Sequence, residues 1–389
     1  GKTTIIKCII KLLSVHGDIA LAAPTGRAAK RMSEACGMEA KTLHRLLEYG
    51  GEEGDFARTQ DNPLEFDTLI IDEMSMVDIF LMRSLLRALV PGTRLIMVGD
   101  ADQLPSVGAG NVLRDILDSE VIPSVRLTEI FRQAAESAIV RSAHGVNRGE
   151  LPDLRRNAND FFCLRRRDPQ SAVETIVDLC RRRLPERMGI PADQIQVLSP
   201  TRRRGTGTAV LNQALQAALN PPAEQKGERR FGDWIFRAGD RVMQVKNNYD
   251  ILWREEGGTA SGMGMFNGDI GVIRTVDKEV VLVDFDGKLV EYTPDMLGEL
   301  EPAFAVTVHK AQGSEYRAVI LAALDGAPML MTRGVLYTAI TRAKSLFIVV
   351  GDDGAVARMV SNNRQARRYS GLRARLAGEL EGHGETALP

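Results

Sequence analysis

The stretch TLIIDEMSMVD, residues 68–78, places two carboxylates directly after a run of apolar and β-branched side chains. A short uninterrupted run of this kind is typical of a strand that is buried on both faces of a parallel sheet. In such sheets the functional side chains gather at the carboxyl ends of the strands. The stretch therefore predicts a buried strand that presents Asp72 and Glu73 at a sheet edge.

Similar runs flank this strand on both sides. DIALAAP (18–24) and RLIMV (94–98) are apolar, and polar residues follow each of them. Helical periodicity covers residues 5–15, 25–36 and 77–89, with Thr25 in position to cap the second of these helices. We therefore predict a first α/β domain over residues 1–150. Within it, the polar and glycine-containing segment 48–66 predicts a hairpin or loop insertion.

The alternation restarts in the second half of the chain. Its apolar runs are FFCL (161–164), IQVLSPT (195–201), AFAVTV (303–308), AVILAAL (318–324) and SLFIVVGD (345–352). Between them, residues 232–300 read as short strands with Gly and Asp turns, which predicts a small inserted β-barrel. The predicted second α/β domain therefore comprises 151–231 and 301–361, and the polar residues 362–389 are expected to form a flexible tail.

Composition narrows the class of protein. The chain has 389 residues, a formal net charge of −1, 44% hydrophobic and 26% charged residues, and four cysteines without a C-x-x-C pair. These values predict two or three globular domains with reduced thiols. No apolar run approaches the 18 residues of a membrane span and no signal-peptide pattern opens the chain, so we expect a cytoplasmic protein without a membrane partner. A nucleic-acid surface would have to be a local basic stripe.

The opening residues GKTT resemble the end of a phosphate-binding loop, whose full pattern is G-x-x-x-x-G-K-[ST]. Lys2 would neutralise the β- and γ-phosphates, and Thr3 or Thr4 would begin a helix whose N-terminus faces them. The Asp72 carboxylate and the Thr3 hydroxyl would hold Mg²⁺. Glu73 would orient and deprotonate the attacking water. The plainer alternative is that Asp72 and Glu73 form a solvated strand end.

Seven segments together resemble the motor core of superfamily 1 helicases of the RecD-like branch, the alpha-subunit type of exodeoxyribonuclease V. They occur in the order of that family and span nearly the whole chain: APTGRAAKR (23–31), TLHRLL (42–47), LIIDEMSMVD (69–78), VGDADQLPSVGAGNVL (98–113), LTEIFRQ (127–133), FAVTVHKAQGSEY (304–316) and LYTAITRAKSLFIVVGD (336–352). The resemblance implies two RecA-like P-loop NTPase domains with parallel sheets, ATP with Mg²⁺ between them, and single-stranded DNA as the track. It also implies an SH3-like β-barrel in the second domain and a pin hairpin in the first.

The resemblance assigns roles to individual residues. The catalytic candidates are Lys2, Glu73, the γ-phosphate sensor Gln103, and two arginine fingers, Arg132 and Arg342. The nucleotide-binding candidates are Gly1, Lys2, Thr3, Thr4, Asp72, Gln103 and Gly313, with Thr3 and Asp72 as the Mg²⁺ ligands. The DNA-binding candidates are Pro24, Thr25, Arg27, His44, Thr307, His309 and Lys310. His44 could equally pack or cap locally, and Arg202–Arg204 could line the DNA channel.

The expected function is an ATP-dependent helicase of DNA recombination and repair. It would move 5′→3′ on single-stranded DNA, act on tailed duplexes, and work with other recombination subunits. Because the front of the phosphate loop would precede Gly1, we expect residues 1–389 alone to hydrolyse ATP poorly, and a non-catalytic DNA-binding or docking role stays open. A nuclease is the remaining alternative, for which Asp284 and Asp286 beside Lys288 form the only candidate metal pair.

Overall fold

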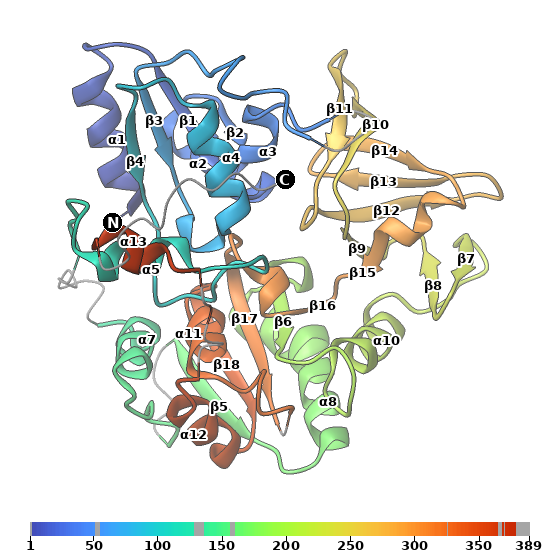
Figure 1. The fold of residues 1–389 in the computed structure, drawn as a ribbon. Coiled ribbons are helices and arrows are strands. Elements are labelled where there is room, and N and C mark those ends of the chain that lie inside the picture. The colour runs from blue at the N-terminus through green and yellow to red at the C-terminus, as the bar shows by residue number, and fades with distance from the viewer. Residues whose placement is uncertain are drawn as a thin grey trace, which may run out of the picture. The chain divides into compact units, whose positions relative to one another are not determined.

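The computed structural model describes residues 2–50, 55–127, 136–155, 160–324, 326–364, 368 and 370–378. The chain forms two compact units. The first comprises Gly1–Ile130 and Ala366–Pro389, and the second comprises Phe131–Gln365. Figure 1 shows a parallel α/β sheet in each unit and an antiparallel sheet within the second. Each unit is described by itself below.

The first unit is built on a four-stranded parallel sheet in the order β2-β1-β3-β4. Its strands are β1 (Ile19–Ala23), β2 (Ala40–Thr42), β3 (Thr68–Ile71) and β4 (Arg94–Met97). All four residues of β3 are buried, because apolar clusters cover both faces of the sheet: Ile70 packs on one side, and Leu69 and Ile71 pack on the other. The strand predicted from TLII is thereby confirmed.

Helices cover both faces of this sheet. They are α1 (Lys2–Leu13), α2 (Gly26–Cys36), α3 (Leu43–Leu46), α4 (Ile79–Ala88), α5 (Val112–Ser119) and α13 (Leu372–Leu376). Three of them begin at side-chain caps: Thr25 accepts a hydrogen bond from the Ala28 amide, Thr42 from the Arg45 amide, and Asp78 from the amides of Phe80 and Leu81. The cap predicted at Thr25 is therefore present.

Two peripheral segments of the first unit had predictions from the sequence, the insertion at 48–66 and the flexible tail at 362–389. The predicted insertion starts as a hairpin, since Tyr49 and Phe56 form an antiparallel bridge and the Ala57 amide donates to the Glu48 carbonyl at 3.2 Å. Residues 51–54 lie outside the described part. The expected flexible tail contains α13, whose Leu372 and Leu376 pack against the core of this unit.

The second unit contains a five-stranded parallel sheet in the order β16-β6-β17-β18-β5. Its strands are β5 (Phe161–Arg165), β6 (Ile195–Ser199), β16 (Ala305–Thr307), β17 (Tyr316–Ala323) and β18 (Ala343–Gly351). The longer helices beside it are α7 (Ala138–Arg148), α8 (Pro169–Asp178), α10 (Thr208–Leu219), α11 (Arg333–Ile340) and α12 (Asp353–Ser361), and a π-helical turn at Leu179–Arg183 leads from α8 into α9 (Leu184–Met188). Because α7 packs on α11, it belongs to this unit, so the boundary lies before α7 and not at the predicted residue 150.

An antiparallel sheet is inserted between α10 and β16. Its order is β11-β10-β14-β13-β12-β9-β15, and a separate hairpin, β7 (Glu228–Phe231) with β8 (Trp234–Arg237), precedes it. The strands are β9 (Arg241–Gln244), β10 (Asn248–Glu255), β11 (Ser261–Met265), β12 (Ile270–Val276), β13 (Val281–Phe285), β14 (Lys288–Tyr292) and β15 (Leu300–Pro302). Fully buried Val283, Val290 and Tyr292 lie in its core.

One buried amide fixes the return from the antiparallel sheet to the parallel sheet. The Asn212 amide of α10 donates to the carbonyls of Pro302 and Ala305 at 3.2 and 2.9 Å, and its oxygen accepts from the Ala305 amide at 2.8 Å. These bonds satisfy the backbone at the corner where β15 ends and β16 begins. No helix in the described part of the chain is both long and apolar enough to cross a membrane.

Candidate functional site

The edge of the first sheet brings a lysine to the acidic pair. Lys2 is the first residue of α1, and Asp72 and Glu73 follow β3. The Lys2 Nζ lies 3.7 Å from Glu73 Oε1 and 4.0 Å from Asp72 Oδ1. The sequence placed these residues 70 positions apart and predicted that they would meet. The described side chains therefore form the cation and carboxylates of the candidate phosphate site.

The Glu73 carboxylate of this site is buried, and Asp72 is half-buried. Glu73 is only 6% exposed, and its φ of 55° lies in the left-handed region that side chains other than glycine rarely adopt. Burial raises the pKa of Asp72 above its ordinary value, Lys2 opposes that shift, and the neighbouring Glu73 adds to it. The Glu73 amide also donates to Asp72 Oδ1 at 2.8 Å. A solvated strand end would show none of these features.

Several buried polar atoms of this unit have no hydrogen-bond partner among the residues that the structure describes. They include Lys2 Nζ, Glu73 Oε2, Ser75 Oγ and Gln103 Oε1. Gln103 is 5% exposed, and its Nε2 donates to Asp100 Oδ2 at 3.1 Å. Buried polar groups without partners are costly, so their presence beside a sheet edge points to a polar ligand that completes them. Ser75 was not among the predicted site residues, because its only signal in the sequence is its position two residues after Glu73.

The donors of this edge fit a nucleotide with Mg²⁺. Carboxylate and hydroxyl oxygens are the ligands that Mg²⁺ prefers, and Asp72 and Thr3 supply one of each. Thr3 and Thr4 are exposed in the first turn of α1. A helix N-terminus attracts phosphate through its free amides. Gly1, the remaining predicted contact, lies outside the described residues.

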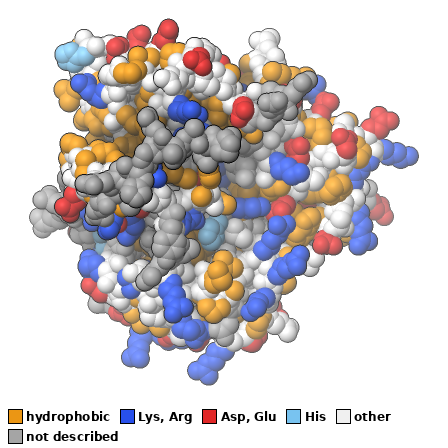
Figure 2. All heavy atoms as spheres, in the orientation of Figure 1, with side chains coloured by type: hydrophobic (Ala, Val, Ile, Leu, Met, Phe, Trp, Pro, Cys, Tyr) orange, Lys and Arg blue, Asp and Glu red, His pale blue; other side chains and the backbone are white. Residues whose placement is uncertain are grey.

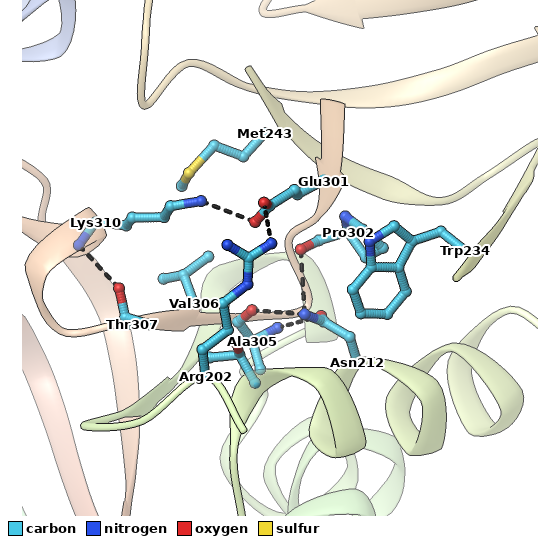
Figure 3. A pocket seen from close by; sticks show the side chains of 11 residues that line it. Arg202, Asn212, Trp234, Met243, Glu301, Pro302, Ala305, Val306, Thr307 and Lys310 are labelled. Atoms are coloured by element: carbon cyan, nitrogen blue, oxygen red, sulfur yellow. Dashed lines mark hydrogen bonds and ion pairs between the residues drawn. The ribbon is translucent and has the colours of Figure 1, made fainter. Parts of the chain in front are cut away.

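A second polar edge lies at the carboxyl end of β16 in the other unit (Figure 3). Thr307 ends the strand, and its hydroxyl accepts from the Lys310 amide at 3.3 Å. Lys310 Nζ lies 2.8 Å from Glu301 Oε2, and Arg202 Nη2 lies 2.5 Å from Glu301 Oε1. These residues line a small open pocket. The structure thus brings Thr307 and Lys310 together with Arg202.

The turn that follows Lys310 is tightly folded. Burial lowers the pKa of His309, which favours a neutral imidazole. Gln312 is buried, and Gly313 has a φ of 70°, which favours glycine at this position. Figure 2 shows Lys and Arg side chains recurring across the visible face, with Asp and Glu among them. The net charge of −1 means that cations and anions are nearly equal in number over the chain, so a basic site can only be local.

Family models match three parts of the chain. An AAA domain model matches residues 1–109, the SH3 domain of ATP-dependent RecD-like DNA helicases matches 211–285, and the C-terminal domain of UvrD-like helicases matches 302–350. The first model therefore covers Lys2, Asp72, Glu73 and Gln103. The third covers Thr307, Lys310 and their turn.

Curated relatives match along almost the whole chain. The RecBCD enzyme subunit RecD of Mycobacterium tuberculosis is 32% identical over 417 residues, which cover 97% of this chain and 69% of that protein. The chain belongs to the RecD-like helicase family. The ATP-dependent RecD2 DNA helicase of Deinococcus radiodurans is 36% identical over 371 residues, covering 94% of this chain. The RecD-like chain spans 48% of that RecD2 protein, about half of its length.

Solved structures support the fold of this RecD-like chain. Bacteroides Pif1 bound to ssDNA gives a TM-score of 0.51 at 19% identity, covering 90% of this chain and 86% of that one. Pif1 helicase from Candida albicans gives a TM-score of 0.51 at 20% identity, covering 92% and 89%. The predicted fold class, parallel α/β sheets with an antiparallel insertion, is confirmed.

Of the two predicted arginine fingers of the RecD-like chain, Arg342 lies among the described residues. Arg342 is 3% exposed, and its guanidinium donates to the carbonyls of Thr338 and Ser314 at 3.3 and 3.1 Å and to Thr341 Oγ1 at 3.2 Å. All of these acceptors belong to the second unit. The Arg342 side chain therefore stabilises the turn after Gly313 through its bond to Ser314. Arg132 lies outside the described residues.

The predicted DNA contacts of the first unit lie where β1 leads into α2. Pro24, Thr25 and Arg27 are half-buried there, and the Thr25 hydroxyl accepts the capping bond. A hydroxyl that accepts one hydrogen bond can also donate one to a phosphate. His44 packs instead against the rings of Tyr49 and Phe56, with centroids 5.6 and 5.8 Å away. Burial lowers its pKa, although Asp78 opposes the shift.

The carboxylates considered for a nuclease form a hairpin turn. Asp284 pairs with Arg274 at 2.5 Å and accepts from the Gly287 amide at 2.6 Å. Asp286 and Gly287 both have positive φ, as the two central residues of a tight β13–β14 turn require. The described residues contain no cluster of three or more His, Cys, Asp or Glu side chains suited to a metal. Turn formation therefore accounts for this pair.

Proposed function

We propose that this chain is the motor core of an ATP-dependent DNA helicase that uses ATP hydrolysis to move along single-stranded DNA. The observation that carries the proposal is the cluster of Lys2, Asp72 and Glu73, together with the partnerless buried atoms beside it. The relatives add support, because RecD2 of Deinococcus radiodurans is named an ATP-dependent DNA helicase. The same proposal makes tailed duplexes the substrate and other recombination subunits the partners, since the mycobacterial relative is a RecBCD subunit.

The hydrolytic step uses side chains of the first unit. The partnerless Glu73 Oε2 accepts a proton from the attacking water, whose oxygen bonds to the γ-phosphorus while the bond to the ADP oxygen breaks. The Lys2 ammonium offsets the negative charge of the phosphates. Gln103 Oε1 accepts a hydrogen bond from the attacking water and so senses the γ-phosphate through that water. Bound Mg²⁺, held by Asp72 and Thr3, would neutralise charge on the phosphate oxygens.

Arg342 supplies positive charge in this proposal. It would have to exchange its bonds to Thr338, Ser314 and Thr341 for bonds to phosphate oxygens. Charge-assisted bonds to phosphate are stronger than bonds to neutral acceptors, so the exchange is favourable once the phosphate is in reach. Because Ser314 follows Gln312 and Gly313, release of the guanidinium would free the turn beside the DNA candidates. Arg132 keeps the same proposed role on sequence grounds alone.

DNA binding in this proposal rests on phosphate contacts. Thr25 and Arg27 in the first unit, and Thr307 and Lys310 in the second, provide hydroxyl and cationic donors at strand ends. The neutral imidazole of His309 would contribute a hydrogen bond rather than charge. Such contacts do not read bases, so binding should tolerate any sequence and weaken as salt rises.

Unwinding of tailed duplexes tests this function and its direction. With ATP and Mg²⁺, we expect this chain, preceded by a complete phosphate-binding loop, to separate duplexes with a 5′ single-stranded tail and few duplexes with a 3′ tail, as the family resemblance implies. The matched control omits ATP and should leave both duplexes intact. A preference for the 3′ tail would remove the proposed direction. Shortened strands in Mg²⁺ without ATP would favour the nuclease instead.

A further inference from the structure

A carboxylate occupies the centre of the polar edge in the second unit. Glu301 lies in β15 and reaches between Arg202, from the loop after β6, and Lys310, from the turn after β16 (Figure 3). Each of its two oxygens contacts a different cation, at 2.5 and 2.8 Å. The pocket thus contains two cations, the Thr307 hydroxyl, and one internal anion. The two cations and the Thr307 hydroxyl are also donors that suit a phosphate group.

The backbone around Glu301 holds its carboxylate in this position. Glu301 pairs with Met243 of β9, and the next residue, Pro302, is tied to Asn212 of α10 through its carbonyl. The Arg241 guanidinium adds a bond to the Ile195 carbonyl of β6 at 3.0 Å. The antiparallel sheet is therefore fixed to the parallel sheet directly after Glu301. Its side chain enters the pocket from a rigid element and not from a loose loop.

The ion pairs of this cluster are partly open to solvent. The side chains of Glu301, Lys310 and Arg202 are 23%, 31% and 60% exposed. Ion pairs at such exposure are weak and can exchange partners. A DNA phosphate carries the same charge as the carboxylate and accepts the same hydrogen bonds. The two anions therefore compete for the same cations.

We propose that Glu301 is an internal competitor of the DNA phosphate in the second unit. Its carboxylate satisfies Arg202 and Lys310 when no strand is bound, and a phosphate must displace it from at least Lys310 to bind. Glu301 thereby lowers the affinity of this site and makes release of the strand easier. The inference rests on the proposed DNA-binding role of Lys310, and it adds a role for Glu301 that no helicase segment of the sequence indicated.

The test measures binding of a fluorescently labelled oligothymidine by anisotropy over a series of salt concentrations. Glu301→Gln keeps the size of the side chain and removes its charge, so we expect binding about five-fold tighter at low salt. The dependence of log K on log salt should also become steeper, because in the wild type the displaced carboxylate takes up a cation that the DNA releases. A merely structural role would not steepen that slope.

Two further variants make the result specific. Glu291→Gln removes a similar ion pair on the same sheet, between Glu291 and Arg254, and should leave binding unchanged. Combining Lys310→Ala with Glu301→Gln should cancel the gain. Glu301→Ala removes the carboxylate without placing an amide in the pocket and should act in the same direction as Glu301→Gln.

The outcomes separate this inference from the proposed function. Unchanged or weaker binding by both Glu301 variants, with a wild type that binds DNA, would overturn the competitor role alone. Failure of the wild type and of every variant to bind the oligonucleotide would overturn the DNA-binding function and the competitor role together. The folding of each variant is checked by fluorescence, because both tryptophans, Trp234 and Trp253, lie in the second unit.

Discussion

Glu73 combines a strained backbone with a nearly buried carboxylate. A left-handed conformation in a residue other than glycine costs on the order of 1 kcal/mol and persists where the surrounding structure imposes it. The strand β3 and the 3-10 turn η1 (Met74–Met76) impose it here, since the Met74 amide donates to the Val98 carbonyl of the neighbouring segment at 3.0 Å. Strain and burial together are typical of a residue that is placed for chemistry.

His309 predicts a dependence of stability on pH. Because burial lowers its pKa in the folded state, the unfolded chain binds the proton more tightly, and stability should fall as pH drops below the ordinary histidine value of about 6.5. Each pH unit below that value removes at most about 1.4 kcal/mol until the folded imidazole also titrates. His309→Gln should lose this part of the acid sensitivity.

Urea denaturation followed by tryptophan fluorescence at pH 7.5 and 5.5 checks this expectation. The difference in free energy of unfolding between wild type and His309→Gln should shrink on acidification. The exposed His16 provides the control, since His16→Gln should unfold like the wild type at both pH values. A gap that stays constant between the two pH values would show that His309 does not titrate as described.

Some site residues could be predicted from the sequence and others could not. Lys2 was predictable from the GKTT pattern, and Asp72 and Glu73 were predictable because they directly follow the apolar run TLII. Glu301 was not, because its partner Arg202 lies 99 residues earlier and only the fold brings them together. The burial of Arg342 could not be predicted either, because its guanidinium bonds to backbone carbonyls of two separate segments.

At the scale of elements, the pairing of β17 with β18 depends on one glycine. Gly351 ends β18 and lies opposite Ala323, and a Cβ at Gly351 would lie 1.9 Å from the Ala323 carbonyl oxygen. Gly351→Ala must therefore push β17 and β18 apart. We expect it to lower the free energy of unfolding by about 1–3 kcal/mol, the usual cost of overpacking.

Tryptophan fluorescence during urea denaturation again reports the result. Gly298→Ala is the matched control, because its Cβ would meet only the Phe231 ring at an ordinary 3.6 Å. The midpoint for Gly351→Ala should fall well below that of the control. Equal midpoints for the two variants would mean that the strands accommodate the methyl group without cost.

The elements themselves were largely predictable from periodicity. The apolar runs became strands within one or two residues, as β3 and β6 illustrate, because strands buried on both faces need uninterrupted apolar sequence. The predicted strands of 232–300 carried no individual bounds for β10 and β11, whose Leu252 and Met263 are exposed on a hairpin. The helix α13 was not predicted because it is short, although Leu372 and Leu376 stand four residues apart on one helical face.

At the scale of the whole molecule, function concentrates in a few polar edges of a nearly neutral chain. Each unit presents its candidate residues at the carboxyl ends of parallel strands, as α/β sheets generally do. The antiparallel insertion reaches the second of these edges through Glu301. The proposed function assigns nucleotide phosphates to the first edge and DNA phosphates to the second, as an ATP-driven motor on DNA would require.

DNA-stimulated ATP hydrolysis tests the central claim most directly, in this chain preceded by a complete phosphate-binding loop. The wild type should hydrolyse ATP faster when single-stranded DNA is added. Glu73→Gln should bind ATP but lose at least about 100-fold in turnover, the usual contribution of a general base. The exposed Glu65 is the control, and Glu65→Gln should match the wild type. Turnover by Glu73→Gln at the wild-type rate would contradict the account.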